Sequence, residues 1–371
     1  MKKISVFGTS NKRHEKRIPL HPSLFHLIPN NIKPFLIFES GYGDRFGIDD
    51  SFLVEEFGGV ETRDNLFEVG DIWLLPKPSK NDYTHFSEGK ILWGWPHCVQ
   101  DTNITEAAIV KKMTLIAWEA MYGGEDDTHI FHRNNELAGY ASVQHMMMLT
   151  GKNGYFGKEI KAAVLGFGAT ARGAINSLKS LGIKDITVFS KRPVYLIKAP
   201  IESVKYKRII NLSGENMLEN SNMQPVPCAK ELSSYDIIVN CVLQNILKPI
   251  MFIRNGELDN FKTPIDIIDV SCDHGLGFYF AKPTGFDNPN SIVESKVNYY
   301  SVDHTPTLYW DSASYEITKS IIDFLPHFVE NKWKENSVLM SALEIECGHI
   351  VNVNILESQN RSTLYPHKIC E

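Results

Sequence analysis

The segment AAVLGFGATARG, residues 162–173, is the feature that most constrains how this chain can fold. In it Gly166, Gly168 and Ala171 occupy a G-x-G-x-x-G/A pattern, directly after an apolar run and at the start of a helical pattern. The first glycine permits a tight turn, the second lets the backbone approach a pyrophosphate, and the alanine permits close packing of helix on strand. N–H groups of the helix N-terminus would face that pyrophosphate. The pattern predicts a dinucleotide-binding Rossmann unit, the alternative being a glycine turn that only joins strand to helix.

The end of the next predicted strand indicates which dinucleotide would bind. An NAD-selective fold places Asp or Glu there to accept a hydrogen bond from the ribose 2′-hydroxyl. Here the strand ends in Ser190, Lys191 and Arg192. Without a carboxylate nothing repels a 2′-phosphate, and two cations with a hydroxyl can pair with it. We therefore predict NADPH as the cofactor, with NADH less favoured, the alternative being that both cations belong to an ordinary solvated loop.

Short apolar runs alternate with helical patterns along the chain, and this predicts parallel α/β architecture. A length of 371 residues is typical of two compact domains. The first series of predicted strands covers 4–7, 35–38, 72–75, 90–93 and 114–118. The second covers 162–165, 186–189, 237–240, 265–270 and 299–302. A helix at 133–149 is expected to connect the two series.

A second helix, capped by Asp311 or Ser312, has apolar residues at a spacing of three to four and is expected to lead back to the first domain. The tail beyond it is too short to fold alone. We expect residues 1–132 plus 310–371 to form a discontinuous substrate domain, and residues 133–309 to form the NAD(P)-binding domain. The predicted fold class is thus α/β, with two Rossmann-like doubly wound domains and the active-site cleft between them.

Composition excludes several classes of function. The chain has 44 acidic and 38 basic residues and a formal charge of −6, so no uniform basic field is available for a nucleic acid or an anionic membrane. No apolar run reaches the roughly 18 residues of a membrane span, and the N-terminus makes a poor signal peptide. The six cysteines are widely spaced and form no zinc pattern. We expect a cytoplasmic protein with reduced thiols and no metal.

Three residues of the first domain each follow a predicted strand: Arg17, Lys77 and His97. Ligands of open α/β sheets bind outside the carboxyl ends of strands, so these side chains can converge on one crevice. Arginine suits bidentate capture of a carboxylate, lysine can polarise a keto oxygen, and histidine exchanges protons near neutral pH. Taken singly, each also has an ordinary interpretation, as a surface charge or a hydrogen-bonded structural histidine.

Two strand ends in the second half carry an Asp-His pair, at Asp273 with His274 and at Asp303 with His304. A metal site would need a third ligand, and the sequence indicates none. Roles in turns or helix caps are the alternative to a functional role.

Together these segments resemble the alanine dehydrogenase and pyridine nucleotide transhydrogenase family, which also includes saccharopine-type dehydrogenases. The resemblance runs from residue 3 to about residue 328, and within the family it is strongest to the N5-(carboxyethyl)ornithine synthases. The segments that carry it are GYGDRFGIDD at 41–50, GWPH at 94–97, AGYASVQ at 138–144, IDVSCD at 268–273 and HTPTLY at 304–309.

The resemblance implies roles for five residues. Arg17 and Lys77 would contact a 2-oxo acid, and His97 would be the acid/base group. Asp273 would lie beside the substrate and the nicotinamide. Glu119 matches a family glutamate, to which we assign substrate binding.

Two features depart from the family pattern. His304 stands where relatives commonly have Asn beside the nicotinamide, so we place it at the cofactor with altered hydrogen bonding. The tail beyond about residue 330 is longer than in carboxyethylornithine synthases and has no assigned role.

The function implied is an NADPH-dependent oxidoreductase acting on CH–NH bonds. It would condense a basic amino acid, such as ornithine or lysine, with pyruvate or another 2-oxo acid to give an N-carboxyalkyl amino acid. The alternatives are an alanine dehydrogenase that uses ammonia, a saccharopine-type dehydrogenase, and a non-catalytic nucleotide-binding module. Its partners would be small-molecule substrates and further copies of itself, with no nucleic acid and no membrane.

Overall fold

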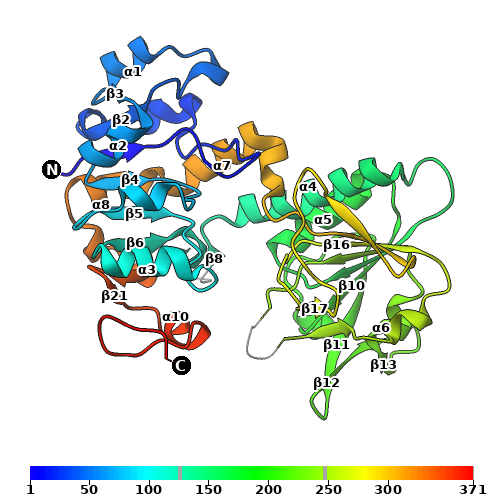
Figure 1. Ribbon diagram of the computed structural model, residues 1–371. Coiled ribbons are helices and arrows are strands. Elements are labelled where there is room, and N and C mark those ends of the chain that lie inside the picture. Colours follow the sequence, from blue (N-terminus) through cyan, green and yellow to red (C-terminus); the bar gives the residue numbers. More distant parts are fainter. Residues whose placement is uncertain (124–127, 245–248, 371) are drawn as a thin grey trace. The chain divides into compact units, whose positions relative to one another are not determined.

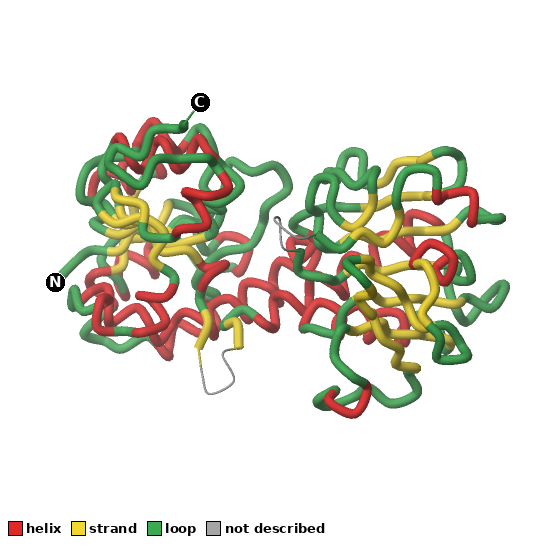
Figure 2. The backbone as a smooth tube through the Cα atoms, turned by 90° about the horizontal axis from the view of Figure 1, so that it is seen from below, coloured by secondary structure: helices red, strands yellow, loops and turns green. Residues whose placement is uncertain are grey.

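Two large sheets organise the computed structural model, which describes residues 1–123, 128–244 and 249–370. Within those residues one sheet has eight strands, the other has nine, and two further sheets have two strands each. The chain divides into two compact units (Figure 1): unit 1 comprises Met1–Phe131 and Trp310–Glu371, and unit 2 comprises His132–Tyr309. In each unit the strands are flanked by helices (Figure 2). No helix of the described residues has the length and apolarity needed to cross a membrane.

The sheet of unit 1 has the strand order β21-β20-β6-β5-β4-β1-β2-β3. Its strands are β1 (Ile4–Val6), β2 (Leu36–Glu39), β3 (Val60–Glu61), β4 (Ile72–Leu74), β5 (Ile91–Gly94), β6 (Thr114–Ala117), β20 (Leu343–Glu346) and β21 (His349–Ile350). Strands β1 to β6 pair in parallel, whereas β20 joins β6 antiparallel and extends the sheet from the C-terminal part of the chain. Because helices cover both faces, the central strands β1 and β4 are buried on both sides.

The helices of unit 1 are α1 (Asp50–Glu56), α2 (Arg63–Val69), α3 (Thr102–Val110), α7 (Trp310–Ile321), α8 (Leu325–Val329), α9 (Ser337–Ser341) and α10 (Val353–Ser358). One core includes Trp93 of β5 with Ile317 and Ile321 of α7. Another includes Trp73 of β4 with Ile355 of α10. The C-terminal part of the chain therefore contributes to both cores of unit 1.

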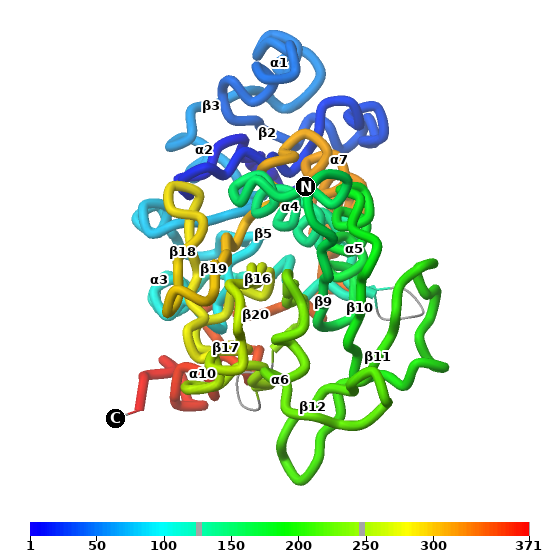
Figure 3. The backbone as a smooth tube through the Cα atoms, turned by 90° about the vertical axis from the view of Figure 1, so that its right-hand side faces the viewer, coloured from blue at the N-terminus to red at the C-terminus, as the bar shows by residue number. Residues whose placement is uncertain are grey.

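Unit 2 has the strand order β13-β12-β11-β10-β9-β14-β16-β19-β18. Its strands are β9 (Lys161–Leu165), β10 (Asp185–Ser190), β11 (Lys205–Leu212), β12 (Glu215–Glu219), β13 (Pro225–Pro227), β14 (Ile237–Asn240), β16 (Ile265–Asp269), β18 (Asn290–Val293) and β19 (Val297–Tyr300). Numbered along the chain, the six parallel strands β9, β10, β11, β14, β16 and β19 have the order 3-2-1-4-5-6 of a Rossmann fold (Figure 3). The order reverses between β9 and β14, the point at which such folds bind dinucleotides.

Two glycines bring α4 (His132–Thr150) against α5 (Ala169–Ser180). A Cβ atom at Gly139 would lie 1.9 Å from Thr170 O, and one at Gly173 would lie 1.7 Å from Glu136 O. No side chain fits at either position, so the two helices pack backbone to backbone. This contact fixes α5, whose N-terminus begins at the glycine motif. Unit 2 also contains α6 (Cys228–Leu232).

The remaining two-stranded sheets pair β7 (Tyr122–Gly123) with β8 (Thr128–His129), and β15 (Met251–Ile253) with β17 (Gly277–Phe278). All ten predicted strands coincide with observed strands to within two residues at either end. The predicted start of the second helix is wrong, because α7 begins at Trp310, directly after a 3-10 helix at Thr305–Tyr309. Asp311 and Ser312 therefore lie inside the first turn of α7 and not before it. The apolar spacing predicted for one helix extends over two helices, because α7 ends at Ile321 and Pro326 stands in the first turn of α8.

Candidate functional site

In unit 1 the structure brings together the three residues predicted from strand ends, Arg17, Lys77 and His97. The Nζ atom of Lys77 lies 2.9 Å from Nε2 of His97. Both cations flank the ring of Trp95: the guanidinium carbon of Arg17 is 5.0 Å from the ring centroid, and Lys77 Nζ is 5.2 Å from it. A cation this close to an indole is attracted by its π face. The tryptophan therefore holds two positive side chains at one place.

Local backbone geometry explains why Lys77 and Trp95 meet. They follow the neighbouring parallel strands β4 and β5, and Trp95 N donates to Pro76 O at 2.9 Å. The residue before Trp95 is Gly94, and no side chain fits there because a Cβ atom would lie 1.9 Å from Leu75 O. The close approach of the two chains at this glycine sets the position of the site.

The loop that carries Arg17 is held by α7. Ser314 Oγ accepts a hydrogen bond from Ile18 N at 2.9 Å, and Thr318 Oγ1 accepts one from His21 N at 2.6 Å. Both hydroxyls are buried. The position of Arg17 thus depends on a helix nearly 300 residues further along the chain.

Glu15 pairs with Arg17 and was not predicted from the sequence. Arg17, only 6% exposed, donates from Nε to Glu15 Oε1 at 2.8 Å and from Nη2 to Oε2 at 2.6 Å. Burial opposes ionisation of Glu15, but the charge and hydrogen bonds of Arg17, with the charge of Lys77, prevail and lower its pKa to about 2. One edge of the guanidinium is therefore engaged by the protein itself, so a substrate carboxylate would meet its other atoms or displace Glu15.

Glu119 lies on the opposite side of His97 from Lys77. Its Oε1 accepts a 2.6 Å hydrogen bond from the backbone N–H of His97 and lies 3.5 Å from Nδ1 of the ring. Because an ammonium group only donates, a protonated Lys77 requires Nε2 to accept, which leaves the ring proton on Nδ1, facing Glu119. The three side chains thus form a connected path for protons.

The environment of Glu119 favours its protonated form. The side chain is 28% exposed as a whole, but its Oε2 atom is enclosed and has no hydrogen-bond partner within the described residues. Burial, reinforced by the charge of Glu344, raises the pKa of Glu119 to about 7, against the opposing effects of Lys77 and the backbone of His97. A carboxyl group with such a pKa can exchange protons near neutral pH.

In unit 2, five of the predicted cofactor residues line one cavity of about 290 Å³ at the carboxyl ends of β9, β10 and β14, whereas Ala171 and His304 are not part of its lining. Its lining comprises Gly166, Phe167, Gly168, Ser190, Lys191, Arg192, Ile209, Cys241, Val242 and Leu243. Gly166 has a φ of +93°, which favours glycine, and a Cβ atom at Gly168 would meet nothing within 4 Å. Ala171 is fully buried on the inner side of α5. The open space before a helix N-terminus fits a dinucleotide pyrophosphate.

Ser190, Lys191 and Arg192 follow one another in the lining of this cavity. Ser190 is buried, and its Oγ accepts a hydrogen bond from Arg192 N at 3.1 Å, whereas the side chains of Lys191 and Arg192 are exposed. No acidic side chain is among the described residues that line the cavity. The chemistry of this lining fits an anionic group such as a phosphate.

Behind the cavity, Asp269 at the end of β16 accepts hydrogen bonds from Tyr299 Oη at 2.8 Å and Asn240 Nδ2 at 2.9 Å. Burial raises the pKa of Asp269 to about 7. Asn240 Oδ1 in turn accepts from the N–H of Val242, a cavity residue. Sequence reasoning missed Asp269, although it lies in the same strand-end segment as Asp273.

The structure places the remaining predicted residues as follows. Asp273 is partly buried in the loop after β16, and burial raises its pKa. The His304 ring is buried, with Nδ1 2.5 Å from Asp303 Oδ1 and an edge-to-face contact with Phe286 at 4.9 Å. Among the described residues, no group of three or more His, Cys, Asp or Glu side chains could hold a metal ion.

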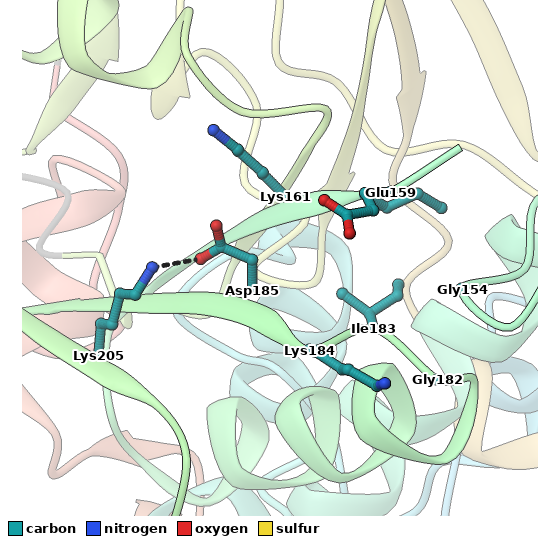
Figure 4. A pocket seen from close by; sticks show the side chains of 9 residues that line it. Gly154, Glu159, Lys161, Gly182, Ile183, Lys184, Asp185 and Lys205 are labelled. Atoms are coloured by element: carbon teal, nitrogen blue, oxygen red, sulfur yellow. Dashed lines mark hydrogen bonds and ion pairs between the residues drawn. The ribbon is translucent and has the colours of Figure 1, made fainter. Parts of the chain in front are cut away.

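A second cavity in unit 2, of about 390 Å³, lies at the amino ends of β9 and β10 (Figure 4). Asp185 and Lys205 form an ion pair of 2.8 Å at its edge, and Lys161 stands beside them. None of the predicted site residues lines this cavity. Its charges are solvent-facing residues at the starts of strands.

Comparisons with known proteins show what this chain is similar to. The family model "Alanine dehydrogenase/PNT, C-terminal domain" matches residues 136–353. N(5)-(carboxyethyl)ornithine synthase of Clostridium botulinum is 24% identical over 323 residues, covering 82% of this chain and 90% of that protein. Alanine dehydrogenase 2 of Staphylococcus aureus is 22% identical over 364 residues, covering 94% of each. A solved structure of L-alanine dehydrogenase matches with a TM-score of 0.75 at 17% identity, covering 96% of this chain and 98% of that one.

The structural match shows a two-domain Rossmann-like fold, as predicted. The family and the relatives indicate an oxidoreductase that uses NAD or NADP. Because the family model covers more than half of the chain, and the glycine motif and strand order lie inside the match, this protein belongs to the alanine dehydrogenase/PNT family.

Proposed function

We propose that this protein catalyses an NADPH-dependent reductive condensation. The amino group of a basic amino acid such as ornithine or lysine would combine with pyruvate or another 2-oxo acid, giving an N-carboxyalkyl amino acid. The observation that carries this proposal is the 2.9 Å contact between Lys77 Nζ and His97 Nε2, beside Arg17 on Trp95. The likeness to N(5)-(carboxyethyl)ornithine synthase supports this substrate class.

Arg17 and Lys77 would bind the oxo acid. A carboxylate beside Arg17 gains charge-assisted hydrogen bonds, and Trp95 beneath it restricts the guanidinium to one plane. Lys77 would donate to the keto oxygen, drawing electrons from the carbon that the amine attacks. Since Lys77 also contacts His97, the oxygen that it polarises lies within reach of the histidine.

His97 would act as the acid of the dehydration step. Addition of the amine to the keto carbon gives a carbinolamine, and its hydroxyl leaves as water when His97 supplies a proton. Gly166 and Gly168 would hold a reduced nicotinamide dinucleotide, which would supply the hydride needed to reduce the resulting C=N bond. Glu119, with a pKa raised to about 7 chiefly by burial, lies 3.5 Å from Nδ1 of His97 and would interact with the proton that the ring carries there. Asp273 would stabilise the positive charge of the protonated imine.

Cofactor choice rests on Ser190, Lys191 and Arg192. These residues would bind the 2′-phosphate of NADPH, with the pyrophosphate at Gly166 and Gly168. His304, paired with Asp303, would adjoin the nicotinamide.

Alanine dehydrogenase is the second candidate. It is favoured by the match to alanine dehydrogenase 2, which extends over 94% of both chains. In that case ammonia replaces the amino acid, and the same roles apply to Lys77 and His97.

A grid of amines and 2-oxo acids, assayed by oxidation of NADPH and NADH with mass analysis of products, separates these candidates. We expect pyruvate with ornithine or lysine to react at least about tenfold faster than pyruvate with ammonium, because a second ammonium group adds binding energy that ammonia lacks. His97→Gln protein is the background control. A rate with ammonium that equals or exceeds that of every amino acid would establish the alanine dehydrogenase alternative.

A further inference from the structure

The loop that carries His97 has a backbone conformation that needs support. His97 has a φ of +51°, in the left-handed region that residues other than glycine rarely adopt. Its carbonyl accepts hydrogen bonds from Gln100 N at 3.0 Å and Asp101 N at 2.9 Å, which close the loop on itself. Such a conformation persists only where surrounding contacts maintain it.

Two of these contacts come from the C-terminal end of the chain. Gln359 Nε2 donates to the carbonyl of Cys98 at 2.5 Å, and Ser358 Oγ donates to the carbonyl of Val99 at 3.1 Å. Thr105 Oγ1, on α3, donates to the same Cys98 carbonyl at 3.0 Å. The two peptide groups that follow His97 are thus held by residues about 260 positions away in sequence.

Gln359 is itself oriented by a buried arginine. Its Oε1 accepts from Arg361 Nε at 2.7 Å, and Arg361 Nη1 donates to Glu106 on α3 at 2.8 Å and to His367 O at 3.0 Å. Arg361 is 5% exposed and Gln359 is 7% exposed. Because arginine only donates and a carbonyl only accepts, the amide has one orientation, with Nε2 directed at Cys98.

From these contacts we infer that the C-terminal segment 353–367 positions His97 for proton transfer, with Gln359 as its positioning residue. The inference rests on the proposed function, in which His97 is the acid. Packing of the tail alone needs only apolar contacts such as that of Ile355 with the core. The buried Gln359, oriented by the buried Arg361, instead holds the carbonyl of Cys98, the residue after His97, and so supports the conformation of the loop.

Replacing Gln359 should therefore change chemistry more than binding. When the Cys98 carbonyl loses this donor, the strained loop can relax and the His97 ring moves relative to Lys77. A displacement of about 1 Å at a catalytic group can reduce turnover by as much as 10²-fold. The side-chain hydrogen bonds of Gln359 go to Cys98, Thr105 and Arg361, none of which is a proposed substrate or cofactor residue, so substrate and cofactor affinity should hold.

The test uses the full-length protein with Gln359→Met, Gln359→Glu and the control Glu357→Gln, an exposed position on α10. Methionine keeps the shape but neither hydrogen bond, whereas glutamate keeps the acceptor for Arg361 and loses the donor to Cys98. We expect both Gln359 variants to lower kcat about ten- to hundredfold, with KM and NADPH affinity within about twofold. The limb of the kcat–pH profile that depends on His97 should also shift. Parent-like kcat and pH profile in both variants would overturn the inference.

A second readout needs no turnover. The ring resonance of ¹³C-labelled His97, identified by its loss in His97→Gln, should shift in the Gln359 variants and not in Glu357→Gln. Hydrogen exchange of the peptide groups at 97–101 should also accelerate. If the parent turned over no substrate pair, the proposed function would fail while this readout still tested the positioning role. Unchanged resonance and exchange would refute that role.

If the Gln359 variants fail to fold, Ser358→Ala tests the positioning role in their place. Its hydroxyl is exposed, so its removal spares the core while deleting the contact with Val99. A shifted His97 resonance in this variant supports the positioning role, and an unmoved one contradicts it.

Discussion

Lys77 Nζ and His97 Nε2 lie 2.9 Å apart, each just beyond the end of one of two adjacent parallel strands. The contact joins a lysine amino group to an imidazole ring. Glu119, on the opposite side of the imidazole, completes the path for protons.

Replacing His97 with Gln should reduce kcat by about 10²- to 10⁴-fold, the usual loss when a general acid is removed. NADPH affinity should be unchanged, because His97 is not among the residues that line the cavity that would bind it. Steady-state kinetics and a binding titration measure the two effects. His26→Gln, at an exposed position of unit 1, is the matched control. A folded His97 variant with parent turnover would remove the histidine from the mechanism.

Lys77→Met should both raise KM for the oxo acid and lower kcat, because polarisation of the carbonyl increases in the transition state. Kinetics with the oxo acid varied at saturating amine and NADPH give both constants. The exposed Lys80 provides a control, Lys80→Met. If only KM changed, Lys77 would bind the acid without taking part in the chemistry.

Arg17→Met should destabilise the protein by about 3–5 kcal/mol, because it leaves the buried carboxylate of Glu15 without its partner. The double variant Arg17→Met with Glu15→Gln should recover most of this loss, since no buried charge remains. KM for the oxo acid should stay high in both. Denaturant unfolding measures stability, and a single variant as stable as the parent would show that the pair contributes little.

The stability of the parent should fall as pH rises from about 4.5 to about 7. Glu119 has its pKa raised from 4.5 to about 7, so in this window the folded state binds more protons than the unfolded state. The contribution of Glu119 to the free energy of unfolding is therefore present in full below pH 4.5, and it is lost as the pH rises through the folded-state pKa of about 7. Glu119→Gln should make the free energy of unfolding less dependent on pH, so that its change between pH 4.5 and 7 is smaller by about 1–3 kcal/mol. Unfolding free energies at several pH values test this, and parallel curves for the two proteins would contradict it.

Preference for NADPH over NADH should be about tenfold to a thousandfold, from one or two charge-assisted hydrogen bonds to the 2′-phosphate. Ser190→Asp combined with Lys191→Gln and Arg192→Gln should erase or invert it. Lys184→Gln, on the opposite cavity of unit 2, is the control. Direct titration with both dinucleotides gives the ratio. Equal affinity of the parent for both would show that neither cation contacts the phosphate.

The ten predicted strands could be identified because each buried run, such as Ile237–Asn240, is apolar and ends in a turn, whereas β11, with lysine and arginine side chains, was missed. The C-terminal strand β20 was missed because Leu343 pairs with Ile116, far away in sequence, and its own segment alternates charge with apolar residues. Local patterns carry no information on such a partner.

The site was predictable where strand ends carry unusual side chains, as at Lys77 and His97. Glu15 could not be separated from the charged run around it, since burial of its pair with Arg17 depends on the folded loop. Trp95 stands in a segment that sequence reasoning did identify, but its contact with two cations requires the strand register. Gln359 lies in the tail beyond residue 330, where no sequence motif indicates a role.

The divided composition of unit 1 has a consequence for synthesis of the chain. A ribosome releases residues 1–131 long before residues 310–371. Trp93 therefore emerges before Ile317 and Ile321, which belong to the same core. The edge of β6 likewise emerges before its partner strand β20. Unit 2 is contiguous and can fold as soon as it is complete. The N-terminal part of the nascent protein must therefore wait with an uncovered apolar face and an unpaired strand edge, the features that chaperones bind and that promote aggregation.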